Sequence, residues 1–230
     1  MIDRLYHRSK ILMLLAFKPV IFFERINQLE WYKHTLQMWF ESYAFESKSK
    51  ILDIGCATGV LAQHISKAGY QVEGVDLSEG MIEIAKRNNP TIPYHVADVK
   101  KLPFKNEVFD VVLSASLINI VEDKNSALKE MVRVCKQGGT ISVLVPLKGF
   151  ESTELSALQQ TLGISGFSLE ALKTWNKRPP KMTINTLNAL FITMGLNVQK
   201  PKKYLNGMVF SLSAVKGEKK TTVKAPNVNA

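Results

Sequence analysis

A glycine turn with a carboxylate at its start is the segment of this sequence best suited to ligand binding. Asp53 precedes Gly55 by two residues, and Gly59 follows four residues later. Glycines have no Cβ, so a ligand can approach the backbone of such a turn closely. A carboxylate aimed into the turn repels a diphosphate, which costs on the order of 1 kcal/mol or more when the site is partly desolvated. The turn therefore favours a positively charged group.

The spacing of this turn also differs from that of a dinucleotide site. In the fingerprint G-x-G-x-x-G/A, the second and third small residues would fall at Ala57 and Val60. The methionine end of S-adenosylmethionine carries an ammonium and a sulfonium, which a carboxylate attracts. We therefore expect S-adenosylmethionine as the ligand and keep an NAD-dependent oxidoreductase as an alternative.

Two further carboxylates follow the next two predicted strands. Asp76 comes 17 residues after Gly59, and Asp98 ends the third strand. Open α/β sheets bind ligands at the carboxyl ends of their strands, where Asp76 can accept hydrogen bonds from both hydroxyls of a ribose and Asp98 can meet an adenine edge. Each acid alone could equally be a turn or helix-capping residue. Three acids at successive strand ends favour a binding site.

These segments together resemble the motifs of class I S-adenosylmethionine methyltransferases. The matching segments are Ile51–Gly59, Gly74–Ser78, Ala97–Val99, Phe109–Val112 and Arg133–Gly139. The resemblance covers about residues 45–146, and it implies a Rossmann-like fold and a methyltransferase that converts S-adenosylmethionine to S-adenosylhomocysteine. Ala57 is a departure, because many members of the family have glycine there.

The resemblance also implies which residues hold the cofactor. The methionine part would be lined by Asp53, Gly55, Cys56, Ala57, Gly59 and the backbone of Ser114. The ribose and adenine would be held by Asp76, Leu77, Met81, Ala97, Asp98 and Val99.

The elements that position these residues alternate between strands and helices. Strands are predicted at 50–54, 71–76, 93–98, 109–114, 140–145, 197–201 and 208–215. Helices are predicted at 60–68, after a Ser78 cap, at 124–136 between an Asp123 cap and Gly138-Gly139, at 155–162, at 169–175 and at 184–194. We therefore expect an α/β fold with a doubly wound, mostly parallel seven-stranded sheet, helices on both faces, an N-terminal helical cap and an insertion after strand five.

The expected domain organisation follows from these elements and from the charge distribution. Residues 1–50 would form the helical cap and 51–215 the cofactor-binding domain, with 147–182 as a helical insertion that covers the substrate. Residues 196–230 carry seven basic and one acidic side chain, out of a net charge of +10. This end could contact nucleic acid or anionic lipid. A basic, flexible tail at 216–230 is the preferred interpretation, because that segment has no apolar pattern.

Composition and the N-terminus bear on the cellular compartment. Cys56 and Cys135 are the two cysteines, and they suggest neither a metal site nor a disulfide framework, so we expect no metal and a cytoplasmic location. Basic residues precede the apolar run 11–17, but Lys18-Pro19 interrupts it and no cleavage site follows. The apolar stretch to Phe23 is too short to span a bilayer. A buried helix is expected, with peripheral contact at a membrane surface as the alternative.

The predicted reaction places modest demands on the protein. Transfer of a methyl group from a sulfonium is an in-line displacement, so the protein must mainly align the reactants and exclude water. Segment 115–121, after the fourth strand, should face the substrate. In relatives that resemble ubiquinone-pathway O-methyltransferases a histidine in this segment is the expected base, but Ile120 takes its place here. This difference weakens an assignment to O-methylation.

The remaining candidates for chemistry are few. Asn119, His34 and His95 are the candidate catalytic residues, and Asn119, Trp31 and Trp175 are the candidate substrate contacts. Each also has a purely structural interpretation, as a loop hydrogen bond, a strand-edge histidine or helix packing. A small or lipophilic metabolite is the expected acceptor. Methylation of RNA or protein, and a regulatory protein that binds the cofactor without turnover, remain as alternatives, although no Asn-Pro-Pro-Tyr-type sequence for nucleic-acid methylation follows strand four.

Overall fold

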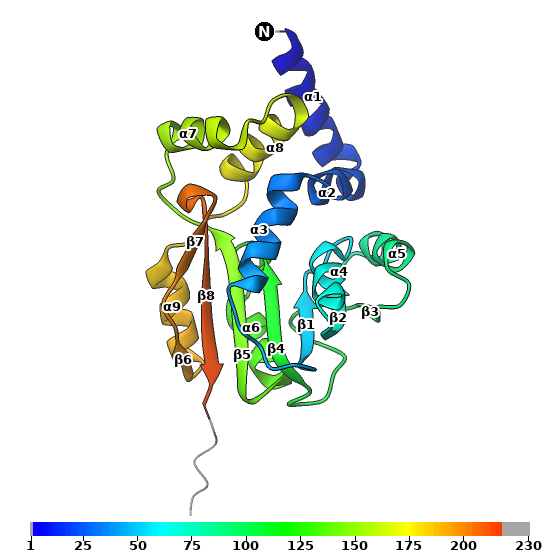
Figure 1. Cartoon of the computed structure of the whole chain (residues 1–230), viewed down its shortest axis with the longest axis vertical. Coiled ribbons are helices and arrows are strands. Elements are labelled where there is room, and N and C mark those ends of the chain that lie inside the picture. The colour runs from blue at the N-terminus through cyan, green and yellow to red at the C-terminus, as the bar shows by residue number, and fades with distance from the viewer. Residues whose placement is uncertain (1, 218–230) are drawn as a thin grey trace, which may run out of the picture.

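The computed structural model describes residues 2–217, with side chains described from residue 5 onward (Figure 1). Residues 218–230, most of the predicted basic tail, lie outside the described part of the chain. The cofactor-binding domain was expected to end at residue 215. The last strand, predicted at 208–215, runs to Lys216.

One sheet runs through the middle of the described residues. Its strands are β1 (Lys50–Ile54), β2 (Gln71–Asp76), β3 (Tyr94–Val96), β4 (Phe109–Ala115), β5 (Cys135–Pro146), β6 (Leu196–Val198), β7 (Lys202–Tyr204) and β8 (Val209–Lys216). The order is β3-β2-β1-β4-β5-β8-β6, with β7 also paired to β8. Strands β1 to β5 pair in parallel, whereas β6 and β7 pair antiparallel with β8, and β8 pairs antiparallel with β5. The predicted α/β fold is confirmed, with the three-residue strand β7 added to the seven expected strands.

Helices cover both faces of the sheet. The helices of the described residues are α1 (Ile2–Phe17), α2 (Pro19–Asn27), α3 (Glu30–Glu41), α4 (Val60–Lys67), α5 (Glu79–Asn88), α6 (Lys124–Val134), α7 (Ser152–Leu162), α8 (Gly166–Lys177) and α9 (Ile184–Thr193). Of these, α3, α4, α5, α6 and α9 pack against the sheet. Alternate residues of a strand point to opposite faces. Ile51 of β1 accordingly joins a core with α3, α4 and α5, and Leu52 joins a second core with α6 and α9.

The boundary between α6 and β5 differs from the prediction. Asp123 caps α6 as expected, because its side chain accepts a hydrogen bond from the Ser126 N–H at 3.0 Å. However, α6 ends at Val134, and the Gly138-Gly139 pair lies within β5 instead of ending the helix. Gly138 has a φ of 72°, and the pairing with β4 shifts register between Phe109 and Val111. The glycines therefore form an irregularity in the strand.

The helices α1 and α2 and the insertion α7–α8 lie together beyond the carboxyl ends of the parallel strands (Figure 1). The helical pattern breaks at Lys18-Pro19, where Pro19 begins α2. Helix α1 packs against α8, so the predicted N-terminal cap is in contact with the predicted insertion. Within residues 2–217, no helix has both the length and the apolar character needed to cross a bilayer.

Candidate cofactor site and an adjoining apolar cavity

The loops that follow β1, β2, β3 and β4 enclose a cavity of about 230 Å³ at one edge of the sheet. Its lining residues are Ile54, Gly55, Val75, Asp76, Leu77, Ala97, Asp98, Val99, Lys100, Leu117, Val121 and Glu122. Six of the residues expected to bind the cofactor are thus brought together by strands that are separated along the chain. This is the position at which open parallel sheets bind ligands.

The glycine turn is held by the neighbouring strand. The N–H groups of Gly55 and Cys56 both donate to the Val75 carbonyl oxygen, at 2.7 and 3.0 Å. Gly55 has a φ of 75°, and an added Cβ would lie 3.2 Å from the Leu117 side chain. The residue at position 55 must therefore be glycine for both backbone and space.

Ala57 and Gly59 complete the turn. Gly59 has a φ of 80° and is the N-cap residue of α4. Ala57 has a φ of 46°, which lies in the left-handed region where side chains other than glycine are strained by on the order of 1 kcal/mol. This conformation explains why glycine suits position 57, and it shows that the alanine is accommodated without rebuilding the turn.

Asp53 lies beneath this turn with an unmet charge. Its side chain is 2% exposed, and its Oδ2 has no hydrogen-bond partner among the described residues. Burial, together with the nearby Asp76 carboxylate, raises the pKa of Asp53 to about 7, although the Ala62 N–H partly offsets this effect. A buried carboxylate normally has a cation or donors around it. A positively charged ligand group above the turn would supply what is missing.

Asp76 and Asp98 have partners of their own. The two oxygens of Asp76 accept hydrogen bonds from the N–H groups of Ala57 (3.0 Å) and Ser78 (2.9 Å). Asp98 accepts a hydrogen bond from the Lys100 N–H at 2.9 Å. Both carboxylates therefore stabilise turns by accepting hydrogen bonds from backbone N–H groups, as expected for turn residues. Each oxygen of an ionised carboxylate retains a second lone pair, so both acids can still accept hydrogen bonds from a ligand.

The other six expected cofactor contacts do not line the cavity: Asp53, Ala57 and Gly59, described above, and three further residues. Cys56, Met81 and Ser114 are buried and are not among the residues that line the cavity. Ser114 Oγ has no partner among the described residues. Tyr94 of β3 packs directly under Gly59, which fixes the distance between the turn and the sheet. These residues support the turn from below.

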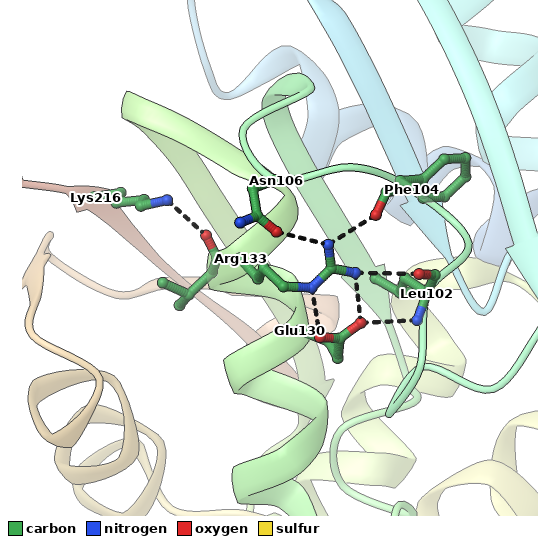
Figure 2. Close-up of polar contacts among 7 residues, drawn as sticks. Leu102, Phe104, Asn106, Glu130, Arg133 and Lys216 are labelled. Atoms are coloured by element: carbon green, nitrogen blue, oxygen red, sulfur yellow. Dashed lines mark hydrogen bonds and ion pairs between the residues drawn. The ribbon is translucent and has the colours of Figure 1, made fainter.

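A charged network holds the loop that follows β3. Figure 2 shows the Arg133 guanidinium bound in a bidentate manner to Glu130, at 2.6 and 2.7 Å. The same guanidinium donates to the carbonyl oxygens of Phe104 and Leu102, at 2.7 and 3.1 Å. Glu130 accepts in turn from the Leu102 N–H at 2.8 Å. The Arg133 segment, part of the motif resemblance, thereby anchors the loop whose beginning, at Asp98, lines the cavity.

A second cavity, of about 250 Å³ and mainly apolar, lies on the other side of the loop after β4. It is lined by Leu15, Phe22, Phe23, Ile26, Tyr32, Ser116, Ile120, Thr174, Trp175, Arg178 and Pro179. Its walls come from the N-terminal helices, the β4 loop and α8. The loop after β4 separates the two cavities: Ser116 and Ile120 line the apolar one, and Leu117 and Val121 line the other.

Tyr32 lines the apolar cavity, although the sequence did not single it out as a site residue. Its ring lines the apolar cavity and contacts Trp175 edge-on at 5.3 Å. Burial and the charge of Asp53 both raise the pKa of its hydroxyl. The aromatic stripe of α3 favours helix packing over an aromatic substrate lid, so by itself it does not mark Tyr32 as a site residue.

The predicted substrate contacts have mixed outcomes. Trp175 lines the apolar cavity, and Trp31 stacks on it at 5.5 Å while donating a hydrogen bond to Ser168 Oγ. Trp31 therefore supports Trp175 from behind. Asn119 is buried and donates to the Pro180 carbonyl oxygen at 3.0 Å, which ties the β4 loop to the segment after α8. This contact fits the interpretation of Asn119 as a residue that hydrogen-bonds within a loop.

Neither candidate histidine lines the two cavities. His95 pairs with Glu73 Oε2 at 2.8 Å, and Glu73 also pairs with Lys50 at 2.7 Å. His34 lies on α3 and lines a separate hollow together with Phe150 and residues of α7. Packing places both away from the cavities, and their role as a base has no geometric support. Residues 2–217 contain no group of three or more His, Cys, Asp or Glu side chains placed to hold a metal ion.

Comparison with known proteins agrees with this arrangement. Residues 52–143 match the family model described as a methyltransferase domain. The chain is 37% identical over 94 residues to a demethylmenaquinone methyltransferase of Streptomyces avermitilis, which covers 41% of each protein. It is 34% identical over 116 residues to a malonyl-[acyl-carrier protein] O-methyltransferase of Erwinia pyrifoliae, covering 50% of this chain and 44% of that protein. The chain thus matches less than half the length of these relatives.

The fold is shared more widely than the sequence. A SAM-dependent methyltransferase from Thermotoga maritima superposes with a TM-score of 0.62 at 20% identity, covering 90% of this chain and 97% of that one. The match to the family model spans the glycine turn and the three acids Asp53, Asp76 and Asp98; Asp98 was expected to end the third strand, but β3 ends at Val96 and Asp98 lies just after it. Residues 52–143 thus match a methyltransferase domain in sequence, and the described residues share the fold of a solved SAM-dependent methyltransferase.

Proposed function

We propose that this protein transfers a methyl group from S-adenosylmethionine to a small, lipophilic acceptor. One observation carries the proposal: a single loop, 116–121, forms the wall between the cavity at the glycine turn and an apolar cavity. A methyltransferase must hold its cofactor and its acceptor next to each other, so that the methyl group can pass from one to the other. The loop meets this requirement, because successive residues along it line the cavity at the glycine turn and the apolar cavity.

The residues at the first cavity fit the cofactor. The unpartnered Asp53 Oδ2 suits the ammonium of the methionine part, and Gly55 leaves the backbone accessible. Asp76 has the capacity to accept from ribose hydroxyls, and the apolar residues Leu77 and Val99 suit an adenine ring. When bound, S-adenosylmethionine supplies an electrophilic methyl group on a positively charged sulfur.

The chain's own contribution is alignment and exclusion of water. Tyr32 and Trp175 would hold the acceptor against the loop after β4, and the helices α1, α2 and α8 would shield it from solvent. Ile120, where related enzymes place a histidine, is an apolar wall of the cavity. We therefore propose an acceptor whose nucleophilic atom needs no histidine base, and we assign α7–α8 as the cover of the acceptor cavity.

The acceptor class is supported by the cavity and by the relatives. The matched curated proteins act on a demethylmenaquinone and on a malonyl-acyl carrier protein, according to their names. Cys56 and Cys135 are both free thiols, which suits the reducing conditions of the cytoplasm. We place the protein there, in peripheral contact with a membrane as the source of an apolar acceptor.

The direct test is transfer of labelled methyl groups. Purified protein would be incubated with methyl-labelled S-adenosylmethionine and, in separate reactions, with the lipid, polar-metabolite, RNA or protein fraction of a cell extract. Label that enters one compound of the organic phase, and is lost in a Tyr32→Phe, Trp175→Ala double variant, would support the proposal. Label in RNA or protein instead would contradict the acceptor class, and cofactor binding without labelled product would favour a regulatory protein.

A further inference from the structure

Helix α1 exposes an apolar stripe to solvent. Its members are Leu5, Tyr6, Leu12, Met13 and Phe17. Spacings of seven and four residues place them on one side of the helix. On the opposite side, Ile11 and Leu14 are buried and the helix packs against α8. Phe17 is 79% exposed and Met13 is 55% exposed, so the stripe has no partner within the described part of the chain.

The exposed apolar surface continues on α2. Ile21 and Phe23 are exposed there, while Phe22 and Ile26 face inward. Phe22, Phe23 and Ile26 also line the apolar cavity. The surface and the proposed acceptor cavity are thus built partly from the same helix. Soluble proteins seldom leave a contiguous apolar patch without an interaction that uses it.

A basic hollow lies beside the stripe. It has a volume of about 450 Å³ and is lined by Arg8, Leu12, Glu170, Lys173, Thr174, Lys177 and Arg178. Glu170, its single carboxylate, pairs with Lys173 at 3.0 Å. Arg8, Lys177 and Arg178 have no ion-pair partner among the residues that the structure describes. Leu12 belongs to both the stripe and the hollow, and Thr174 and Arg178 line both the hollow and the apolar cavity.

We infer that α1 and α2 dock on a negatively charged membrane surface, with the basic hollow against lipid phosphates and the mouth of the acceptor cavity toward the bilayer. Apolar side chains beside unpaired cations are the pattern of helices that lie in a membrane interface. The inference rests on the proposed function only in that a lipophilic acceptor would enter from the bilayer.

A second copy of this chain is a poorer occupant for the same surface. In a two-fold dimer the patch would pack against itself, which brings the same residues of both copies together. Arg8 and Arg178 would then approach the equivalent cations of the partner. Like charges in that position oppose association, whereas lipid phosphates would neutralise them.

Vesicle flotation of the full chain tests the inference without any methyl transfer. Vesicles of phosphatidylcholine alone would be compared with vesicles containing about 30% phosphatidylglycerol, at low salt and at about 0.5 M NaCl. We expect binding to the anionic vesicles that falls at high salt and is at least tenfold weaker on neutral vesicles. Removing the Lys177 and Arg178 charges with glutamine should weaken it about fivefold per charge.

Variants of the stripe give the sharper comparison. Met13→Ser with Phe17→Ser changes two exposed side chains and should reduce binding to anionic vesicles at least tenfold. Ile192→Ser on α9, where the side chain is 59% exposed on another part of the surface, is the matched control and should bind as the unchanged protein does. Binding of S-adenosylhomocysteine should be the same in all of them.

Four results would overturn the inference: no binding to anionic vesicles, equal binding to neutral ones, equal loss in the Ile192 control, or loss only when Lys219, Lys220 and Lys224 are replaced by glutamine. A dimer in sedimentation that Met13→Ser with Phe17→Ser dissolves would identify a second copy as the occupant. Methyl transfer to a lipophilic acceptor held in detergent micelles, by protein that does not bind vesicles, would contradict docking alone. Vesicle binding without transfer would contradict the proposed activity alone.

Discussion

Replacing Asp53 by asparagine separates the role of this side chain in binding from its effect on folding. The carboxyl is buried, one of its oxygens is unpartnered, and its pKa is raised from 3.8 to about 7 by burial and by Asp76. If this carboxylate serves to bind a cationic ligand group, its negative charge should lower the free energy of unfolding of the ligand-free protein. The asparagine side chain keeps an oxygen that can accept from the Ala62 N–H, but it carries no charge.

The expected size of the stability effect follows from the two pKa values. One pKa unit corresponds to about 1.4 kcal/mol, so ionised Asp53 costs the ligand-free fold about 4 kcal/mol above pH 7. Asp53→Asn should be more stable than the unchanged protein by up to this amount at pH 8.5. The gain should decline as the pH falls from 7 and vanish near pH 4, because the folded protein then binds the proton that the unfolded chain takes up only near its pKa of 3.8.

Urea unfolding of the ligand-free protein at pH 8.5 and pH 5 measures the first effect, and calorimetric titration with S-adenosylhomocysteine measures the second. We expect Asp53→Asn to be the more stable protein at pH 8.5 and to bind S-adenosylhomocysteine at least tenfold more weakly. Asp110→Asn is the control, because the Lys136 ammonium lowers the pKa of Asp110 at the far end of β4, and its loss should destabilise the fold without affecting binding. Lower stability of Asp53→Asn at pH 8.5, or undiminished binding, would refute the reasoning.

Three further changes test the supports of the two cavities. Gly74→Ala would place a Cβ 2.5 Å from the Tyr94 ring and should lower the free energy of unfolding in urea by about 1–3 kcal/mol. Gly80→Ala on α5 is the control and should be neutral or stabilising by about 0.5–1 kcal/mol; equal effects of the two changes would contradict the close packing of Tyr94 against the glycines. Arg133→Ala should speed hydrogen exchange in the loop after β3 and weaken S-adenosylhomocysteine binding severalfold, and unchanged exchange there would show that the network does not anchor the loop. Trp175→Ala should raise the KM for the acceptor at least tenfold while leaving S-adenosylhomocysteine affinity unchanged; a loss of cofactor affinity instead would argue against two separate cavities.

The sequence predicted the fold well where periodicity and turn residues agree. The strands β1, β2 and β4 and the caps Ser78 and Asp123 are in their expected places. The end of α6 was wrong because Cys135 satisfies both patterns: it continues the helical spacing and is buried equally well in a strand. Strand β7 was missed, since two of its three residues are lysines and only its pairing with β8 makes it a strand.

The cofactor side of the site was more accessible to sequence reasoning than the acceptor side. Acidic residues at strand ends report their position directly, because parallel strands end at a common edge. Tyr32, Ser116 and Trp175 come from a helix, a loop and an insertion that only tertiary packing brings together. The same packing keeps His34 and His95 away from the cavities, and no local pattern records that separation.

The most direct test of the account is a pair of calorimetric titrations of the purified protein at pH 8, one with S-adenosylhomocysteine and one with NAD. The buried, unpartnered carboxylate at the glycine turn predicts that S-adenosylhomocysteine binds at one site per chain and that NAD gives no binding heat. Saturable binding of NAD together with no response to S-adenosylhomocysteine would contradict it.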